Sequence, residues 1–175
     1  AGGGSWLMLF LQRSWQCGTI QLDFQMPEKF DLWYVGEDHA KYRPVVIHRA
    51  IYGSIDRFLG ILTEHYAGAF PLWLAPIQVK VLPVSNHYEE YAQQVQAMLM
   101  QAGLRVEIDN SNNKLGYKMR AAQQQKIPYM LVVGEQEQQS GSVNVREYNS
   151  NEQRQLPLGE WIELLKESVE AGQRI

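Results

Sequence analysis

The chain of 175 residues has a mass of 20.2 kDa, is 45% hydrophobic and 20% charged, and carries a formal net charge of −3. This apolar fraction excludes wholesale disorder, and the single cysteine excludes a disulfide scaffold. No apolar run reaches the roughly 18 residues that cross a bilayer, so we expect a cytoplasmic protein without a membrane partner. Because the net charge is negative, any binding of nucleic acid must depend on a local basic patch.

The first half of the chain has the pattern of several strands followed by one helix. Residues 1–12, a glycine-rich start and a short apolar run, are left unassigned. Aromatic and β-branched residues mix with polar ones in 15–24, which predicts a strand, and 32–36 and 43–51 are further strand candidates. After Ser54, apolar residues recur at helical spacing as far as Tyr66, and we expect a helix that ends before Gly68.

The second half alternates strands with helices, and we place the domain boundary between residues 75 and 76. Asn86 is expected to cap the first helix of this half, with Glu89 completing a capping box. The order of elements predicts an α/β sandwich with a partly parallel sheet. The predicted strands are 77–84, 104–108, 128–133 and 142–148, and the predicted helices are 86–102, 114–125 and 158–171.

Three polar residues of the first predicted strand could form a ligand-binding row. Simple alternation would place Gln16 on the face opposite Thr19 and Gln21, but Gly18 inside the strand indicates a bulge that brings all three to one face. Such a row of neutral hydrogen-bonding groups suits a polar, uncharged ligand. A solvated sheet face accounts for the same pattern.

Two further residues could take part in chemistry. Arg57 falls in the first turn of the predicted helix, where free N–H groups and the helix dipole favour a phosphate; a local pair with Asp56 or Glu64 is the alternative. His48 lies in an apolar strand, where an isolated histidine is more often a core residue than a metal ligand. The four histidines and Cys17 show no metal-binding spacing.

Residues 105–126 form a local basic segment. Five cationic residues against two acidic ones give it a charge of +3 within a chain of net −3. The loop 109–113 inside it is rich in Asn and Ser, which can read base edges, although a solvated helix face and a polar turn explain the same composition. The chain has no glycine-rich phosphate loop and no nucleophile-elbow motif.

The runs WQCGTIQLDF (15–24), VIHRA (46–50) and GSIDRFLGILTEHYAGAFPLWLAP (53–76) closely resemble the threonyl-tRNA synthetase family. The resemblance covers about residues 13–175, and the histidine in VIHRAIYGS separates it from the glycyl-, prolyl- and histidyl-tRNA synthetases. It implies an α+β or α/β chain in two parts. Residues 13–75 would be the antiparallel-sheet end of a class II catalytic domain, and 76–175 an α/β anticodon-binding domain with a mixed five-stranded sheet and three helices.

The resemblance also implies roles for individual residues. Gln16, Thr19 and Gln21 would line the pocket for threonine and the adenylate, and Arg57, which matches the third class II signature arginine, would grip the phosphates of ATP. His48 would be one of three protein ligands of a zinc ion that binds threonine, and the other two ligands are absent here. The residues expected to read the anticodon of threonine tRNA are Asn112, Glu137 and Arg146.

The implied reaction attaches threonine to threonine tRNA through threonyl-adenylate, with ATP, Mg²⁺ and Zn²⁺, in an enzyme that forms a homodimer at full length. The first and second class II signature motifs are missing from this chain, so we expect it to be inactive alone. The competing interpretation is a non-catalytic tRNA- or RNA-binding accessory module related to the anticodon-binding domain. The retained catalytic-domain residues argue against a pure binding module, which has no need of them.

Overall fold

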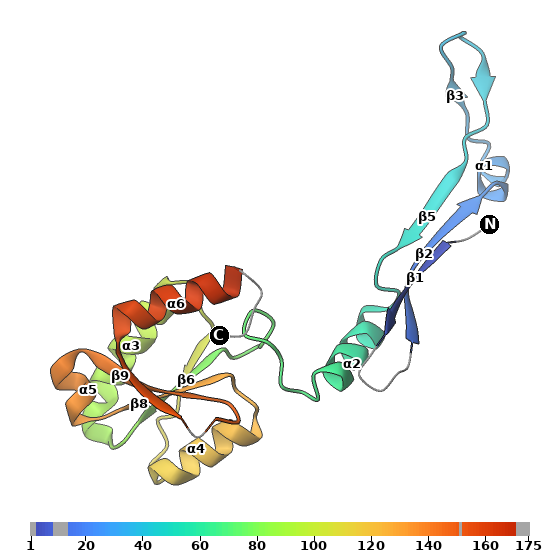
Figure 1. The fold of residues 1–175 in the computed structure, drawn as a ribbon. Helices are drawn as coiled ribbons and strands as arrows, with labels where there is room; N and C mark the ends of the chain where they lie inside the picture. Colours follow the sequence, from blue (N-terminus) through green and yellow to red (C-terminus); the bar gives the residue numbers. More distant parts are fainter. Residues whose placement is uncertain (1–2, 9–13, 151, 171–175) are drawn as a thin grey trace. The chain divides into compact units, whose positions relative to one another are not determined.

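The computed structural model describes residues 3–8, 14–150 and 152–170 (Figure 1). The chain divides into two compact units, Ala1–His65 and Tyr66–Ile175. The first unit contains a three-stranded and a two-stranded sheet, and the second contains a five-stranded sheet. Within the described ranges, no helix combines the length and the apolar character that crossing a bilayer takes.

The first unit consists of antiparallel strands and two helices. Its elements are β1 (Gly3–Met8), β2 (Ser14–Asp23), α1 (Gln25–Lys29), β3 (Tyr34–Val35), β4 (Lys41–Tyr42), β5 (Val46–Ala50) and α2 (Ile55–His65). The larger sheet has the order β1-β2-β5, and β3 pairs with β4 in a separate hairpin. The segment 1–12, left unassigned by the sequence, therefore includes a strand, because β1 pairs with β2 along its length.

The strand predicted at 43–51 is shorter in the structure because Arg43 and Pro44 hold the chain in another conformation. Pro44 has no N–H to donate to a neighbouring strand. Arg43 Nη1 donates to the carbonyl oxygen of Pro27 at 2.9 Å and to Asp31 Oδ1 at 3.1 Å, and its guanidinium lies 3.8 Å from the centre of the Trp33 ring. These contacts tie the segment before β5 to α1 and to the connection between α1 and β3.

The first unit leaves most of its apolar side chains in solvent. Its buried residues, among those described, are Gly18, Pro27 and Ile61. On one face of the larger sheet Ile20 lies opposite Arg49, and Leu22 lies opposite Ile47. The three apolar side chains of this face are 44–65% exposed. A sheet face of this kind is normally covered by another layer of a folded domain.

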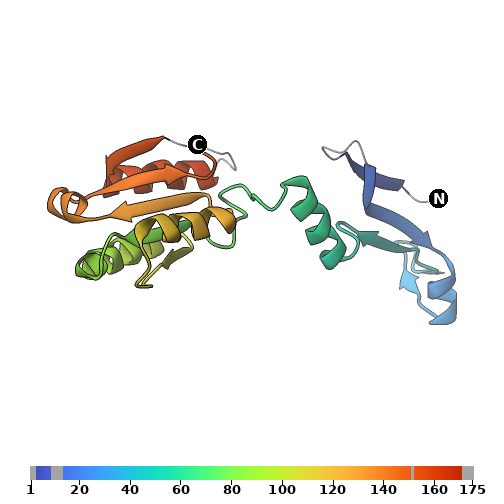
Figure 2. The ribbon, with the colours of Figure 1, turned by 90° about the horizontal axis from the view of Figure 1, so that it is seen from below.

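The second unit is a mixed sheet with helices on both faces (Figures 1 and 2). Its strands lie in the order β10-β9-β8-β6-β7, in which β7, β6 and β8 are parallel and β9 and β10 are antiparallel to their neighbours. The elements are β6 (Val79–Pro83), a 3₁₀ turn (Asn86–Tyr88), α3 (Glu89–Gln101), β7 (Val106–Ile108), α4 (Leu115–Gln124), β8 (Tyr129–Val133), α5 (Glu135–Ser140), β9 (Ser142–Glu147), β10 (Gln153–Pro157) and α6 (Leu158–Glu170).

Each face of this sheet packs against different helices because successive strand residues point to opposite sides. The larger core lies between the sheet and α3 and α6, and includes Val81, Val95, Leu131, Val143 and Trp161. The smaller core lies under α4 and consists of Leu82, Ala122, Ile127 and Met130. On the α4 side, β9 and β10 continue the sheet with polar residues, namely Asn144, Arg146, Gln153 and Gln155.

The two units divide earlier in the chain than the predicted boundary at 75–76. The segment after α2 packs on the second unit, where Leu72 and Ala75 are buried. The Gln78 amide donates to the Leu72 carbonyl oxygen at 2.8 Å and accepts from the Arg105 N–H at 2.8 Å. Arg105 in turn donates to the carbonyl oxygens of Ala75 and Trp73, both at 2.9 Å. These hydrogen bonds make the connecting segment part of the second unit.

The predicted capping box at Asn86 is wrong. α3 begins at Glu89, after the 3₁₀ turn, and no side chain caps its first turn. The Asn86 amide instead donates from Nδ2 to Asn112 Oδ1 at 2.8 Å. The Asn86 side chain therefore links the turn before α3 to the loop after β7, and it does not cap α3.

In the second unit, one helix and one strand are additional to the predicted ones. α5 has the sequence EQEQQS, which contains no apolar residue and so has no helical periodicity to detect. β10 has the sequence QRQLP, in which Leu156 alone is apolar, because β10 is an edge strand. The second unit thus contains α5 besides the three expected helices.

Candidate functional site

β2 contains a bulge at the place that the sequence predicts. Gly4 pairs with Thr19 and Ser5 pairs with Gly18, but the next residue of β1 pairs with Gln16, so that Cys17 is the extra residue. Because residues directly opposite each other point to the same side of a sheet, this register brings Gln16, Thr19 and Gln21 to one face.

His48 belongs to the same face. It lies directly opposite Gln21 in the pairing of β2 with β5. Gln16, Gln21 and His48 are exposed, and Thr19 is half-buried. We call these four residues the polar row. The structure thus joins the predicted imidazole to the three predicted hydrogen-bonding groups, and it shows that His48 is not a core residue.

Arg57 lies in the first turn of α2, as predicted. Gly53, with a φ of +66°, turns the chain from β5 toward this helix, and the Phe58 N–H donates to the carbonyl oxygen of Ser54 at 2.9 Å. A Cβ on Gly53 would lie 3.7 Å from the carbonyl oxygen of Cys17, so the turn passes beside the bulge of β2. The turn into α2 therefore lies beside Cys17, which stands between Gln16 and Thr19 of the polar row.

The Arg57 side chain, however, does not contact the polar row in this structure. Its guanidinium carbon lies 5.2 Å from the centre of the Trp15 ring. Trp15 precedes Gln16, and adjacent strand residues point to opposite sides, so Arg57 packs against the other face of β2. Among the described residues it forms no ion pair with Asp56 or Glu64.

The residues around His48 do not make a metal site by themselves. The described part of the chain contains no group of three His, Cys, Asp or Glu side chains that could hold an ion. A protein-bound zinc ion takes three or four such ligands. His48 therefore fits as one ligand only, and any zinc site would need residues beyond those described.

In the second unit, Asn112 and Glu137 lie at the same edge of the sheet. Asn112 follows β7 and Glu137 lies in the first turn of α5 after β8, and β7 and β8 are both parallel to β6. The Asn112 oxygen accepts from Asn86, which leaves the Asn112 amide N–H groups as the free donors. Glu137 is half-buried, and its Oε2 accepts from the Gly134 N–H at 2.9 Å.

Tyr91 connects α3 to the beginning of β9 at this edge. Its hydroxyl donates to the carbonyl oxygen of Ser142 at 2.8 Å. Burial raises the pKa of Tyr91, and the Glu137 carboxylate raises it further. Glu137 is thus close enough to act electrostatically on this buried hydroxyl, which places it at the edge of the core.

A buried lysine holds the ends of β6 and β7 together. Lys118 on α4 is 2% exposed, and its Nζ donates to the carbonyl oxygens of Pro83 at 3.2 Å and Asp109 at 3.0 Å. Burial raises the pKa of the Asp109 carboxyl, but hydrogen bonds from Ser111 and the ammonium groups of Lys118 and Lys80 outweigh this effect and lower it. Lys118 therefore orders the loop that carries Asn112.

Arg146 lies on the α4 side of the sheet and not at the strand ends. It lies opposite Met130 on β8 and opposite Gln153 on β10. With the Gln153 amide oriented so that its oxygen faces Arg146, the guanidinium donates to it from Nε and Nη2. Arg146 is half-buried, so Gln153 holds it in one orientation above the open part of the sheet.

The two faces of the second unit differ in charge. Residues 110–134, which include α4, contain no carboxylate and four cations, namely Lys114, Lys118, Arg120 and Lys126. On the other face, α3 and α6 carry Lys166 and six carboxylates, namely Glu89, Glu90, Glu160, Glu163, Glu167 and Glu170. A polyanion is therefore attracted to the α4 side and repelled from the other side.

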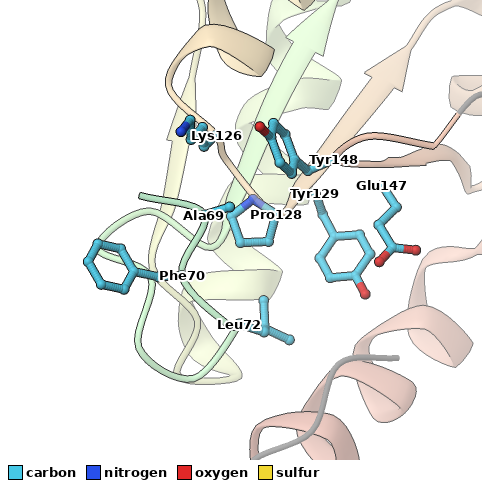
Figure 3. Close-up of a pocket in the computed structure, with 8 residues that line it drawn as sticks. All are labelled: Ala69, Phe70, Leu72, Lys126, Pro128, Tyr129, Glu147 and Tyr148. Atoms are coloured by element: carbon cyan, nitrogen blue, oxygen red, sulfur yellow. The ribbon is translucent and has the colours of Figure 1, made fainter. Parts of the chain in front are cut away.

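Figure 3 shows a small cavity where β8 begins and β9 ends. It has a volume of about 40 Å³ and is lined by Ala69, Phe70, Leu72, Lys126, Pro128, Tyr129, Glu147 and Tyr148. The Lys126 ammonium donates to the carbonyl oxygen of Ala67. Pockets that hold small molecules have volumes of roughly 300–1,000 Å³, so this cavity is not a substrate site.

Sequence reasoning did not find Asn86, Lys118 or Gln153 as supporting residues. The residues next to Lys118 in the sequence give no sign that its ammonium is buried, and the pairing of Asn86 with Asn112 joins two segments that are distant in the chain. Gln153 lies on a strand that the sequence pattern did not predict. These contacts depend on tertiary structure, and only the run of Asn and Ser in 109–113 marked the region.

Two protein-family models match the chain. The model described as "Anticodon binding domain" matches residues 78–168, and "tRNA synthetase class II core domain (G, H, P, S and T)" matches residues 5–66. The two matches fall on the second and the first compact unit, respectively. The chain belongs to the threonyl-tRNA synthetase family.

The relatives place it in the C-terminal part of these synthetases. It is 67% identical over 136 residues to the threonine–tRNA ligase of Syntrophomonas wolfei, covering 78% of the chain and 21% of the relative. It is 58% identical over 160 residues to threonine–tRNA ligase 2 of Bacillus subtilis, covering 91% and 25%. The chain therefore spans about a quarter of the length of such relatives.

A solved structure supports the same assignment. The RNA binding domain of threonyl-tRNA synthetase from Cryptosporidium parvum Iowa II matches with a TM-score of 0.86 and 38% identity, over 95% of this chain and 42% of the other. The expected fold class, a class II synthetase segment followed by an α/β anticodon-binding domain, is confirmed. The match to the class II core model from residue 5 shows that part of the unassigned segment 1–12 belongs to this domain.

Proposed function

We propose that the chain acts as one part of an enzyme that attaches threonine to threonine tRNA. The reaction would join threonine and ATP as threonyl-adenylate and then transfer the threonyl group to the terminal ribose of the tRNA. The observation that supports this proposal is the polar row, which brings Gln16, Thr19, Gln21 and His48 to one face of a class II core sheet. The proposal concerns the full-length synthetase, a cytoplasmic homodimer.

The polar row would contribute by positioning the reactants. The amides of Gln16 and Gln21 and the hydroxyl of Thr19 can each donate and accept hydrogen bonds, which suits the amino acid and the neutral groups of the adenylate. Arg57 would hold the ATP phosphates together with Mg²⁺, and its planar guanidinium can bind two phosphate oxygens at once. In this structure the Arg57 guanidinium packs against the Trp15 ring, on the face of β2 opposite the polar row. Binding of ATP beside the polar row would therefore require another conformation of the Arg57 side chain.

His48 would supply one nitrogen to a Zn²⁺ ion that recognises threonine. The described residues offer no cluster that completes such a site, so the remaining ligands would come from other parts of the synthetase. Zinc bound there would select threonine through its hydroxyl group. Gln21, directly opposite His48, would then face the same substrate.

The second unit would bind the anticodon of threonine tRNA through Asn112, Glu137 and Arg146. The donors of Asn112, the carboxylate of Glu137 and the guanidinium of Arg146 can each hydrogen-bond to base edges, and the α4 side has the charge that RNA requires. The competing function, an accessory RNA-binding module, would share this surface but has no use for the polar row.

The anticodon assignment can be tested by measuring the binding of a threonine tRNA transcript to the chain. We expect Arg146→Ala to abolish measurable binding, and Arg154→Ala to preserve it, because Arg154 pairs opposite Val145 and so lies on the other face. Unchanged affinity of a folded Arg146→Ala variant would contradict the assignment.

The catalytic assignment needs a separate test. We expect ATP–pyrophosphate exchange with threonine to stay at the blank level for this chain alone, and in a full-length synthetase to fall on substitution of the residues that match Gln21 and His48. Exchange by the isolated chain would contradict the incomplete site, and a full-length enzyme indifferent to both substitutions would favour the accessory-module interpretation.

A further inference from the structure

A polar hollow lies on the α4 side of the second unit, beyond Arg146. It has a volume of about 310 Å³ and lies between the end of α4 and the turn after β9. Its lining consists of Arg120, Gln123, Gln124, Tyr148, Asn149 and Ser150. The lining therefore contains one cation, one aromatic ring and several hydrogen-bonding groups, and no carboxylate.

The hollow lies close to Arg146 along the chain. Tyr148 follows Arg146 by two residues, and its N–H donates to the Pro128 carbonyl oxygen at 2.8 Å, which keeps it beside β8. Tyr148 also lines the small cavity in Figure 3, so it contributes to both spaces. Because Arg146 and Tyr148 are only two residues apart in the chain, one strand of RNA can contact both.

Arg120 is available to bind a phosphate. It is exposed, and none of the hydrogen bonds and ion pairs found among the described residues engages its guanidinium. It also belongs to the carboxylate-free segment 110–134, so the local potential attracts an anion. The acidic helices α3 and α6 lie on the other face of the sheet.

We propose that this hollow binds one nucleotide of single-stranded RNA next to the bases that Arg146 contacts. The ring of Tyr148 stacks on the base, Arg120 binds a phosphate, and the amides of Gln124 and Asn149 contact the base edge or the ribose. The inference rests on the proposed anticodon-binding function. It extends that function to a nucleotide of the anticodon loop that Asn112 and Glu137 do not reach, because these two residues lie at the other end of the parallel strands.

Two pairs of variants test the proposal on the full chain, with a transcript of the threonine tRNA anticodon arm as the probe. Arg120→Ala removes the phosphate contact, and Arg154→Ala removes an equal charge from the opposite face. Affinity is measured over a series of salt concentrations, because each lost phosphate contact lowers the slope of log K against log salt by about 0.7 for single-stranded RNA. We expect this loss for Arg120→Ala and an unchanged slope for Arg154→Ala.

The second pair tests stacking. Tyr148→Leu removes the aromatic face, and Tyr148→Phe retains it. We expect about tenfold weaker binding for Tyr148→Leu and near wild-type binding for Tyr148→Phe. Far-UV circular dichroism and urea unfolding confirm that each variant is folded.

The outcomes separate this inference from the function on which it rests. If the wild-type chain does not bind the anticodon arm, the proposed function fails. If the wild type binds and Arg146→Ala does not, but Arg120→Ala matches Arg154→Ala and Tyr148→Leu matches Tyr148→Phe, anticodon binding stands and the additional nucleotide site is refuted. Loss of binding by Tyr148→Phe as severe as that by Tyr148→Leu also refutes the stacking contact.

Discussion

Gln21 on β2 lies directly opposite His48 on β5, Thr19 shares their face by simple alternation, and the bulge at Cys17 adds Gln16. An amide and an imidazole on neighbouring strands, separated by one inter-strand spacing, can contact a single small molecule. The extra residue of the bulge is what brings Gln16 into this arrangement. The juxtaposition therefore depends on one local irregularity of the backbone.

The first prediction concerns zinc. Because His48 is the one ligand proposed for this chain and no cluster of three exists among its described residues, we expect the purified chain to retain no stoichiometric Zn²⁺. Zinc content measured by atomic emission after gel filtration should be the same for the wild type and His48→Ala. One zinc ion per chain, lost in His48→Ala, would show that the chain completes the site by itself.

The second prediction concerns Lys118. Replacing its buried ammonium by the side chain of Met leaves the carbonyl oxygens of Pro83 and Asp109 without their donor. We expect Lys118→Met to lower the free energy of unfolding by about 2–3 kcal/mol, measured by urea titration with circular dichroism. Lys114→Met, at the exposed start of α4, is the matched control and should change stability by less than about 0.5 kcal/mol. Equal effects of the two substitutions would contradict the structural role of Lys118.

The third prediction concerns pH. The pKa of Asp109 is lowered in the folded chain, so its negative charge stabilises the fold above the ordinary value of 3.8, and this contribution is lost as the pH falls through the folded pKa. The difference in free energy of unfolding between the wild type and Asp109→Asn should stay constant from neutral pH down to about pH 5 and shrink below pH 3.8. If the difference in free energy of unfolding between the two proteins grew as the pH falls, the pKa of Asp109 would be raised and not lowered in the folded chain.

The sequence predicted the long elements of both units and the bulge of β2, because these depend on local patterns. Gly18 within a strand marked the bulge, and apolar spacing marked α2, α3 and α6. It could not predict β10, whose polar composition reflects its place at an edge, or α5, which has no apolar side chain. Both elements are held by β9, with which β10 pairs and against which α5 packs, and not by an apolar pattern of their own.

The candidate site divides in the same way. The register of two strands places the polar row, so alternation and one bulge were enough to predict that Gln16, Thr19 and Gln21 share a face. The family resemblance predicts that Arg57 faces the same cleft as His48, whereas the structure places its guanidinium against Trp15, on the other face of β2. Its contact with Trp15 is visible only in three dimensions.

The fourth prediction concerns the orientation of Asn112. Asn86 fixes the Asn112 oxygen, so that the Asn112 N–H groups face outward. We expect Asn86→Ala to weaken binding of threonine tRNA about fivefold, the equivalent of one hydrogen bond, with little change in stability. Asn110→Ala, an exposed amide in the same loop, is the control and should bind like the wild type. If both variants bind equally well, Asn86 does not position Asn112 for RNA.

The fifth prediction concerns the open apolar face of the first unit. Ile20, Leu22 and Ile47 lie together on this face, and β5 is an edge strand, a combination that favours association between chains. We expect the chain to bind a hydrophobic dye and to associate as its concentration rises, and Ile47→Lys to reduce both, measured by fluorescence and analytical ultracentrifugation. Ile55→Lys is the matched control, because Ile55 is also exposed but lies on α2. The lysine of Ile47→Lys places a charge within the apolar face, whereas the lysine of Ile55→Lys changes only the net charge of the chain. If both variants reduced dye binding and association equally, net charge and not this face would govern association.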